Sequence, residues 1–127
     1  MWKDFDPEIL GGNYTGHTDN KAPDAPRTYV WTFPSAKGHP ILNGVRPDRF
    51  VSTSWLYYTA PLAESATPLM AGEVKGETEA PEPVAWTNTT AAGGRVFYTS
   101  LGHPDDFDDP NFRRLLLNGI NWSLDSP

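Results

Sequence analysis

Two histidines occupy positions where this sequence could carry acid–base chemistry. His103 follows the apolar and β-branched segment 95–101 and precedes a helix start, and His17 lies in the glycine-rich segment 11–20. Loops that leave the carboxyl ends of strands bind ligands in open α/β sheets, because helix amino ends and main-chain amides converge there. Imidazole exchanges protons near neutral pH, so we predict His17 and His103 as catalytic residues.

Each of these polar positions also has a purely structural interpretation. The imidazoles of His103 and His17 can close their loops by hydrogen-bonding main-chain groups, and His39, before a proline, is expected to cap a helical turn. The acidic run at 105–109 offers oxygen ligands that suit calcium or magnesium, but its spacing does not match an EF-hand. Acids before a helix are ordinary caps, so we predict capping there.

Aromatic and polar side chains elsewhere in the chain suit a sugar. The C–H face of a sugar packs on aromatic rings, whereas its hydroxyls need hydrogen-bond partners. Trp86 is the aromatic residue we favour, because it lies at the carboxyl end of a predicted strand, although most aromatic residues in so small a protein lie in the core. The predicted substrate-binding residues are Asn13, Tyr14, Tyr57, Trp86, Thr87 and Ser100.

Several strands and one helix would position these residues. Segments rich in β-branched and aromatic residues predict strands at 28–33, within 51–58, and at 67–73, 83–87 and 95–101. The last of these has almost no polar residues, which predicts that both of its faces are covered.

A helix is predicted to begin near Pro110. Asp108 or Asp109 can cap it, and proline fits a first turn because its missing N–H would have no intrahelical partner. Apolar residues then recur at spacings of three and four, which is typical of an amphipathic helix on a core. Its predicted core-facing residues are Phe112, Leu115, Leu116, Gly119, Ile120 and Leu124.

Composition limits the classes of function. At 127 residues the chain is expected to form one domain. A formal net charge of −6, with ten scattered Lys and Arg residues, argues against a nucleic-acid partner. No stretch of about 18 apolar residues predicts a membrane helix, and no signal peptide is recognisable. The absence of cysteine excludes a thiol nucleophile, a thiolate metal site and a disulfide.

No cofactor is predicted. The chain has no phosphate-binding Walker loop, no dinucleotide fingerprint and no serine-hydrolase elbow. Two neutral histidines can bind zinc or another divalent metal, but no third ligand is assignable, so no metal residues are predicted.

Short motifs in a fixed order resemble the signature of ThuA-like, or trehalose-utilisation, domains. They are GGNYTGH at 11–17, HPILNG at 39–44, LY at 56–57, PVAWT at 83–87, GRVFYTSLGH at 94–103 and FRRLLLNGINW at 112–122. Together these motifs are specific and cover nearly the whole chain. The resemblance implies a flavodoxin-like α/β fold of the class I glutamine amidotransferase-like type and a role in carbohydrate metabolism.

Two departures from that pattern carry consequences. ThuA-like domains ordinarily have a strand and a histidine-containing loop well upstream of the GGNYTGH segment, so we expect residues 1–127 to form a partial domain that lacks amino-terminal strands. Exposed strand edges pair with other chains, which favours a homo-oligomer or a companion fragment. Trp55 also stands where the family usually has an acidic residue, so no carboxylate role is carried over to that position.

Three hypotheses of function follow. In the first, His17 and His103 face each other across one cleft and act as acid and base on a trehalose- or keto-sugar-type carbohydrate. In the second, the chain is a non-catalytic carbohydrate-binding or assembly module, and in the third it is a truncated reading frame without activity. Amidotransfer is excluded because it uses a cysteine. The compartment stays open between cytoplasm and periplasm, since a missing amino-terminal region would take a signal peptide with it.

Overall fold

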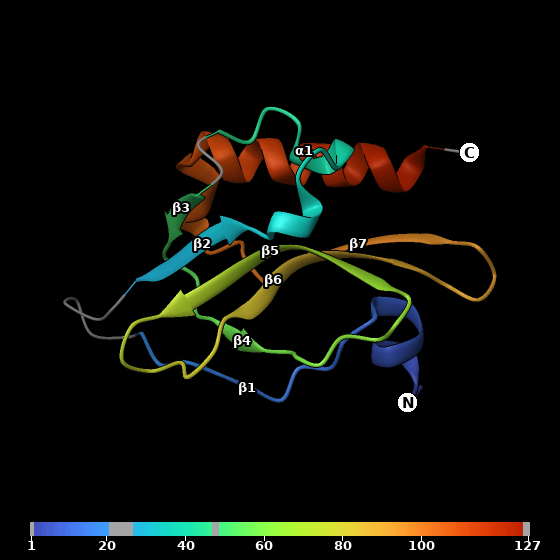
Figure 1. The fold of residues 1–127 in the computed structure, drawn as a ribbon, viewed down its shortest axis with the longest axis horizontal. Coiled ribbons are helices and arrows are strands. Elements are labelled where there is room, and N and C mark those ends of the chain that lie inside the picture. The colour runs from blue at the N-terminus through green and yellow to red at the C-terminus, as the bar shows by residue number, and fades with distance from the viewer. Residues whose placement is uncertain (1, 21–26, 47–48, 126–127) are drawn as a thin grey trace.

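The fold is a curled antiparallel sheet with a long carboxyl-terminal helix against it (Figure 1). The computed structural model describes residues 2–20, 27–46 and 49–125. In chain order the elements are η1 (Asp6–Leu10), β1 (Gly16–His17), β2 (Thr28–Thr32), η2 (Pro34–Ala36), η3 (Pro40–Leu42), β3 (Arg49–Ser52), β4 (Tyr57–Tyr58), β5 (Ala66–Val74), β6 (Glu82–Thr89), β7 (Arg95–Thr99), η4 (Pro104–Asp108) and α1 (Pro110–Leu124).

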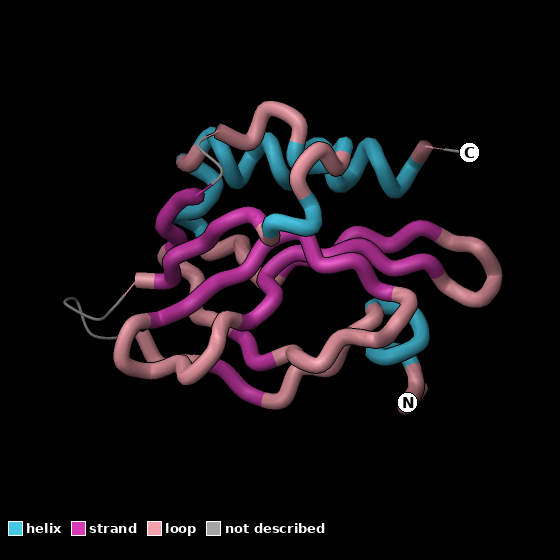
Figure 2. The backbone as a smooth tube through the Cα atoms, viewed as in Figure 1, coloured by secondary structure: helices cyan, strands magenta, loops and turns pink. Residues whose placement is uncertain are grey.

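Five strands form the main sheet in the order β3-β2-β5-β6-β7, and β1 pairs with β4 in a separate two-stranded ladder (Figure 2). The strands predicted at 28–33, 67–73, 83–87 and 95–101 are confirmed as β2, β5, β6 and β7. The strand expected within 51–58 is divided between β3 and β4. The expected loop at 11–20 contains β1, which the sequence did not indicate.

Every neighbouring pair of described strands is antiparallel. For two of the pairs the reason lies in the connections, because β5 and β6 are joined by residues 75–81 and β6 and β7 by residues 90–94. A parallel pair needs a crossover of about a dozen residues or more, which these two links do not provide. The chain thus combines strands and helix as expected, with a sheet that differs from the parallel one of a flavodoxin-like fold.

The helix α1 starts where the sequence predicted. The Asp109 carboxylate accepts a hydrogen bond of 2.7 Å from the N–H of Asn111, and Pro110 occupies the first turn. This side-chain cap satisfies a donor that has no partner within the helix.

The buried face of α1 is narrower than predicted. Phe112, Leu115 and Gly119 are buried, whereas Ile120 is 47% exposed and Leu124 76% exposed. The prediction for Ile120 and Leu124 was therefore wrong. Since β7 is the last strand of the described sheet, no described strand lies beyond it to cover this flank of the helix.

The position of β7 at the sheet margin also corrects its predicted burial. All five of its residues are half-buried rather than enclosed on both faces. An apolar strand sequence shows that a strand has packing partners, but it does not show whether both of its edges are paired.

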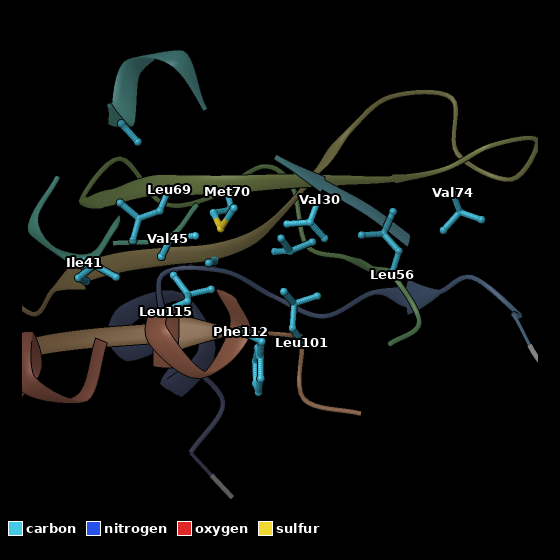
Figure 3. Close-up of a cluster of buried hydrophobic side chains, with 13 residues drawn as sticks. Val30, Ile41, Val45, Leu56, Leu69, Met70, Val74, Leu101, Phe112 and Leu115 are labelled. Carbon is cyan, nitrogen blue, oxygen red and sulfur yellow. The ribbon is translucent and has the colours of Figure 1, made fainter. Parts of the chain in front are cut away.

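The core fills the space between the sheet, α1 and the short η turns. Figure 3 shows its side chains converging from β2, β5, α1 and the loops before β3 and β4. The central members have almost no exposed surface and include Val30, Ile41, Leu56, Leu69, Met70, Phe112 and Leu115. No helix in the described ranges has the length and apolarity needed to cross a bilayer.

Gly119 lets α1 approach β7 closely. A Cβ placed there would lie 2.6 Å from Cγ of Phe97, with other ring atoms nearer still. Glycine is required at this position because real Cβ atoms do not come so close to a ring carbon. The contact fixes the distance between the helix and the strand that leads to His103.

We expect Gly119→Ala to lower the free energy of unfolding by about 1–3 kcal/mol, because the added methyl group overpacks the contact with Phe97. Alanine otherwise favours a helix interior over glycine by roughly 0.5–1 kcal/mol, so a loss of stability is diagnostic of the clash. Urea unfolding measures the change. Asn121→Ala on the exposed side of α1 is the matched control, and Phe97→Leu should restore part of the loss. A gain in stability for Gly119→Ala would contradict the close approach.

Candidate functional site

A cavity of about 390 Å³ lies where β7 ends and the segment between β3 and β4 passes beside it. This volume falls within the range of small-molecule sites, which are mostly apolar with a few placed polar groups. Its lining residues are Ser54, Trp55, Tyr57, Ser100, Leu101, Gly102 and His103. Three of the predicted site residues, Tyr57, Ser100 and His103, therefore meet at one cavity.

A buried carboxylate joins the two segments that form this cavity. Asp106 is only 4% exposed, and its oxygens accept hydrogen bonds from the hydroxyls of Ser52 and Ser54 at 2.6–2.9 Å. The main-chain N–H groups of Thr53 and Gly102 donate to the same carboxylate at 3.1 Å. A buried carboxylate is tolerated only with such partners.

The hydrogen bonds outweigh the burial in setting the charge of Asp106. Burial alone would raise the pKa of the carboxyl group, but the donors from Ser54, Ser52, Gly102 and Thr53 together lower the pKa below its ordinary value. Asp106 is consequently a carboxylate throughout the neutral range.

Ser54 links the Asp106 carboxylate to the backbone of Gly102 and His103. Its hydroxyl donates to Asp106 and accepts the N–H groups of Gly102 at 3.0 Å and of His103 at 2.9 Å. The loop that carries the histidine is thus fixed at two consecutive amides.

The ring of His103 has one nitrogen engaged and one available. Its Nδ1 accepts the N–H of Asp105 at 3.2 Å and caps η4, so the neutral ring carries its proton on Nε2. The imidazole of His103 therefore closes its loop by hydrogen-bonding a main-chain N–H through Nδ1. The side chain is 45% exposed, and the Asp105 carboxylate lies 3.7 Å from Nδ1, where it would face a protonated ring.

The ring of His17 has the opposite tautomer. Its Nδ1 lies 2.7 Å from the carbonyl oxygen of Thr18, which requires a proton on Nδ1 and leaves the Nε2 lone pair available. The ring stacks on Trp55 with centroids 4.7 Å apart and planes inclined by 23°. Because Trp55 lines the cavity, His17 lies next to the cavity wall, although it is not itself a lining residue.

A chain of polar contacts connects the segments of His17 and Ser54. Thr18 accepts the N–H of Leu56 through its hydroxyl and donates that hydroxyl to Asn20. Thr28 donates its hydroxyl to the carbonyl of Ser54 at 2.6 Å and receives the Asn20 amide at 3.5 Å. These contacts hold both histidine-bearing loops on one framework.

Other predicted binding residues lie near His17 or on the cavity. Tyr14 is 51% exposed, stacks on the ring of His17 and meets Tyr57 edge to face at 4.9 Å. The hydroxyl of Ser100 is buried and is without a hydrogen-bond partner among the described residues. Asn13 is exposed in the loop that leads to Tyr14.

Trp86 and Thr87 lie in the core rather than on the cavity. Trp86 has no exposed surface, stacks on Tyr98 at 4.0 Å and donates its Nε1–H to the carbonyl of Leu10 at 2.6 Å. Thr87 is 5% exposed. The strand end that favoured Trp86 as a sugar platform is covered by η1, because the amino-terminal segment folds back on β6.

The residues of the acidic run 105–109 do not all act as caps, in contrast to the prediction. Asp109 caps α1 as predicted, whereas Asp106 is the buried acceptor described above. His39 caps its turn as predicted, accepting the N–H of Ile41 at 3.2 Å, and burial together with Arg95 lowers its pKa. Within residues 2–20, 27–46 and 49–125, no three His, Asp or Glu side chains are grouped to hold a metal ion.

Three residues of the site were not found by sequence reasoning. Ser54 and Trp55 line the cavity and Asp106 anchors it, yet only the replacement at Trp55 drew attention. The run Ser52-Thr53-Ser54 was the available signal, since three consecutive hydroxyl residues after a strand supply donors for a buried acid.

The fold and cavity define a small strand-and-helix domain with a site suited to a polar ligand. A family model described as ThuA, trehalose utilisation, matches residues 1–123. The chain therefore belongs to the ThuA family, which supports a carbohydrate-related role. No curated protein and no solved structure matches the chain significantly.

We expect Asp106→Asn to lower the free energy of unfolding by at least about 2 kcal/mol at neutral pH, because the amide leaves a buried donor unpaired. The lowered pKa of Asp106 gives the sign of the pH dependence. Its stabilisation is complete above the ordinary carboxyl pKa and is lost as the pH falls through the folded-state value. The gap between the two proteins should narrow in acid.

Urea unfolding at a series of pH values measures this gap. Asp108→Asn, at an exposed position of the same acidic run, is the control and should change little. Equal effects of the two substitutions would show that Asp106 does not anchor the site.

Proposed function

We propose that the 390 Å³ cavity binds a carbohydrate of the trehalose or keto-sugar type and that His17 and His103 exchange protons with it. The ThuA match supports the substrate class. Trp55 and Tyr57 offer ring surfaces to the C–H face of a sugar, and Ser100 and His103 offer polar partners to its hydroxyls.

The observation that carries this proposal is the hydroxyl of Ser100. It is buried at the cavity and has no hydrogen-bond partner among the described residues, whereas buried polar groups are nearly always paired. A ligand hydroxyl at this position would satisfy it. Fully apolar ligands would leave it unsatisfied, which favours a polyhydroxylated one.

The two tautomers suggest complementary roles. His17 has a free lone pair on Nε2 and is suited to remove a proton, whereas His103 carries a proton on Nε2 and is suited to donate it. On a keto-sugar, the base takes the proton from the carbon beside the carbonyl, and the acid protonates the carbonyl oxygen. The product is the enediol. His17 then delivers its proton to the former carbonyl carbon while His103 takes the proton of the neighbouring hydroxyl, which gives the isomeric carbonyl sugar and restores both residues.

The open margin of the sheet supports self-association. No described strand pairs with the outer edge of β7, and beside it α1 exposes Leu117, Ile120 and Leu124. Antiparallel pairing of two β7 strands about Phe97 would continue the sheet and bring these apolar side chains together. We propose that a second copy occupies this edge and extends the antiparallel sheet across the interface.

We expect His103→Asn and His17→Gln to lower the rate of saccharide or keto-sugar conversion by about 10²–10⁴-fold, the usual contribution of a positioned acid or base. Asparagine can still cap η4 through its side-chain oxygen, so His103→Asn separates proton transfer from loop closure. Turnover followed by NMR and affinity by calorimetry, with trehalose and its keto derivative, test this.

Affinity for the saccharide should stay within about threefold in both variants if the rings act mainly in the transition state. A saccharide that binds, is never converted and is insensitive to both substitutions would favour the non-catalytic binding module. Failure of any saccharide to bind would contradict the proposal altogether.

For the assembly, we expect light scattering to give a mass of at least twice that of the 14.1 kDa chain. Ile120→Lys with Leu124→Lys should shift it toward the single chain, because charges would replace the apolar contact. Asn121→Lys, exposed on the same helix, is the control and should leave the mass unchanged. A strict monomer at all concentrations would contradict pairing at β7.

A further inference from the structure

A second and larger cavity, of about 750 Å³, lies over β2, β3 and β5. It shares no lining residue with the cavity beside His103. Along β2 the burial alternates, with Thr28 and Val30 buried and Tyr29 exposed, so this cavity lies on the face that points away from the core.

The floor of this cavity is aromatic and apolar. Tyr29 and Trp31 are two residues apart on β2, which places their side chains on the same face of the strand. Register puts Val51 opposite Tyr29 on one side, while the small side chain of Ala71 lies opposite Trp31 on the other. The rings of Tyr29 and Trp31 thus form a platform flanked by Val51, which is 47% exposed.

The rim of the cavity is basic in an otherwise acidic chain. Lys37, Arg49 and Lys75 line it together with a single carboxylate, Glu73, which gives a local charge of 3 − 1 = +2. The whole chain has a formal net charge of −6. The cavity therefore gathers three of the ten Lys and Arg residues against one of the sixteen acids.

One lysine of the rim lies beside the aromatic platform. Nζ of Lys75 lies 5.3 Å from the centroid of the Tyr29 ring, within the range of a cation–π contact. Lys37 is exposed and follows η2 beyond the Thr32 end of β2, whereas Lys75 follows β5 at the Thr28 end. A ligand with a flat apolar face on the rings would bring an attached anion to the ammonium group of Lys75.

We propose that this cavity is a second site that binds a phosphorylated hexose. The C–H face of the sugar would stack on Trp31 and Tyr29, and the phosphate would pair with Lys75. The ThuA match to trehalose utilisation favours a sugar over other ring-bearing phosphates. The proposal is independent of proton transfer at the first cavity, because the two sites have no lining residue in common.

Calorimetry with glucose 6-phosphate at low ionic strength tests the site, with glucose, inorganic phosphate and AMP as comparison probes. We expect binding of glucose 6-phosphate, and a loss of about tenfold in affinity for Lys75→Ala because a charge-assisted contact is removed. Affinity should also fall as salt is added.

Lys3→Ala is the charge-matched control, since it removes one exposed cation that does not line this cavity. It should keep the original affinity. Trp31→Ala should weaken glucose 6-phosphate binding while Trp31→Phe largely retains it, and circular dichroism checks that each variant folds.

Four results would overturn the proposal. They are absence of glucose 6-phosphate binding by the folded protein, equal losses for Lys75→Ala and Lys3→Ala, inorganic phosphate binding as tightly as glucose 6-phosphate, and AMP binding more tightly. The third would mean that only an anion is held, and the fourth that a nucleotide is the better ligand. Failure here would leave conversion at the first cavity untouched.

Discussion

The buried carboxylate of Asp106 is the interaction on which the first cavity depends. It collects donors from Ser52 and Ser54 on one segment and from Gly102 on the other, and Ser54 carries the constraint to the amide of His103. These segments are about 50 residues apart in the sequence, and the buried carboxylate joins them at the cavity. Fully paired polar groups of this kind fix one arrangement, whereas a partly paired set would be costly.

Local signals accounted for most of the secondary structure. The β-branched and aromatic runs gave β2, β5, β6 and β7, and the Asp-Pro start of α1 was confirmed at Asp109. Those features depend on neighbours in sequence, which a pattern contains. The exposure of Ile120 and Leu124 could not be predicted in this way, because it depends on which strand lies at the sheet margin.

Only part of the site could be predicted from the sequence, for the same reason. His103 and Ser100 follow directly from the end of β7 and line the cavity, whereas Trp86, on the adjacent strand, is covered by the amino-terminal turn η1. Asp106 resembled a cap because it lies in an acidic run before a helix. Its partners Ser52 and Ser54 are more than 50 residues earlier, and only tertiary structure brings them together.

The succession of β5, β6 and β7 as hairpins bears on how the protein reaches its native state. Contacts between strands that follow one another close short loops, and such contacts form early because the entropy of closure is small. The hydroxyls of Ser52 and Ser54 reach Asp106 only across long loops. We therefore expect the hairpin meander to assemble before the histidine loops are fixed, so that the scaffold is complete before the chemistry it supports.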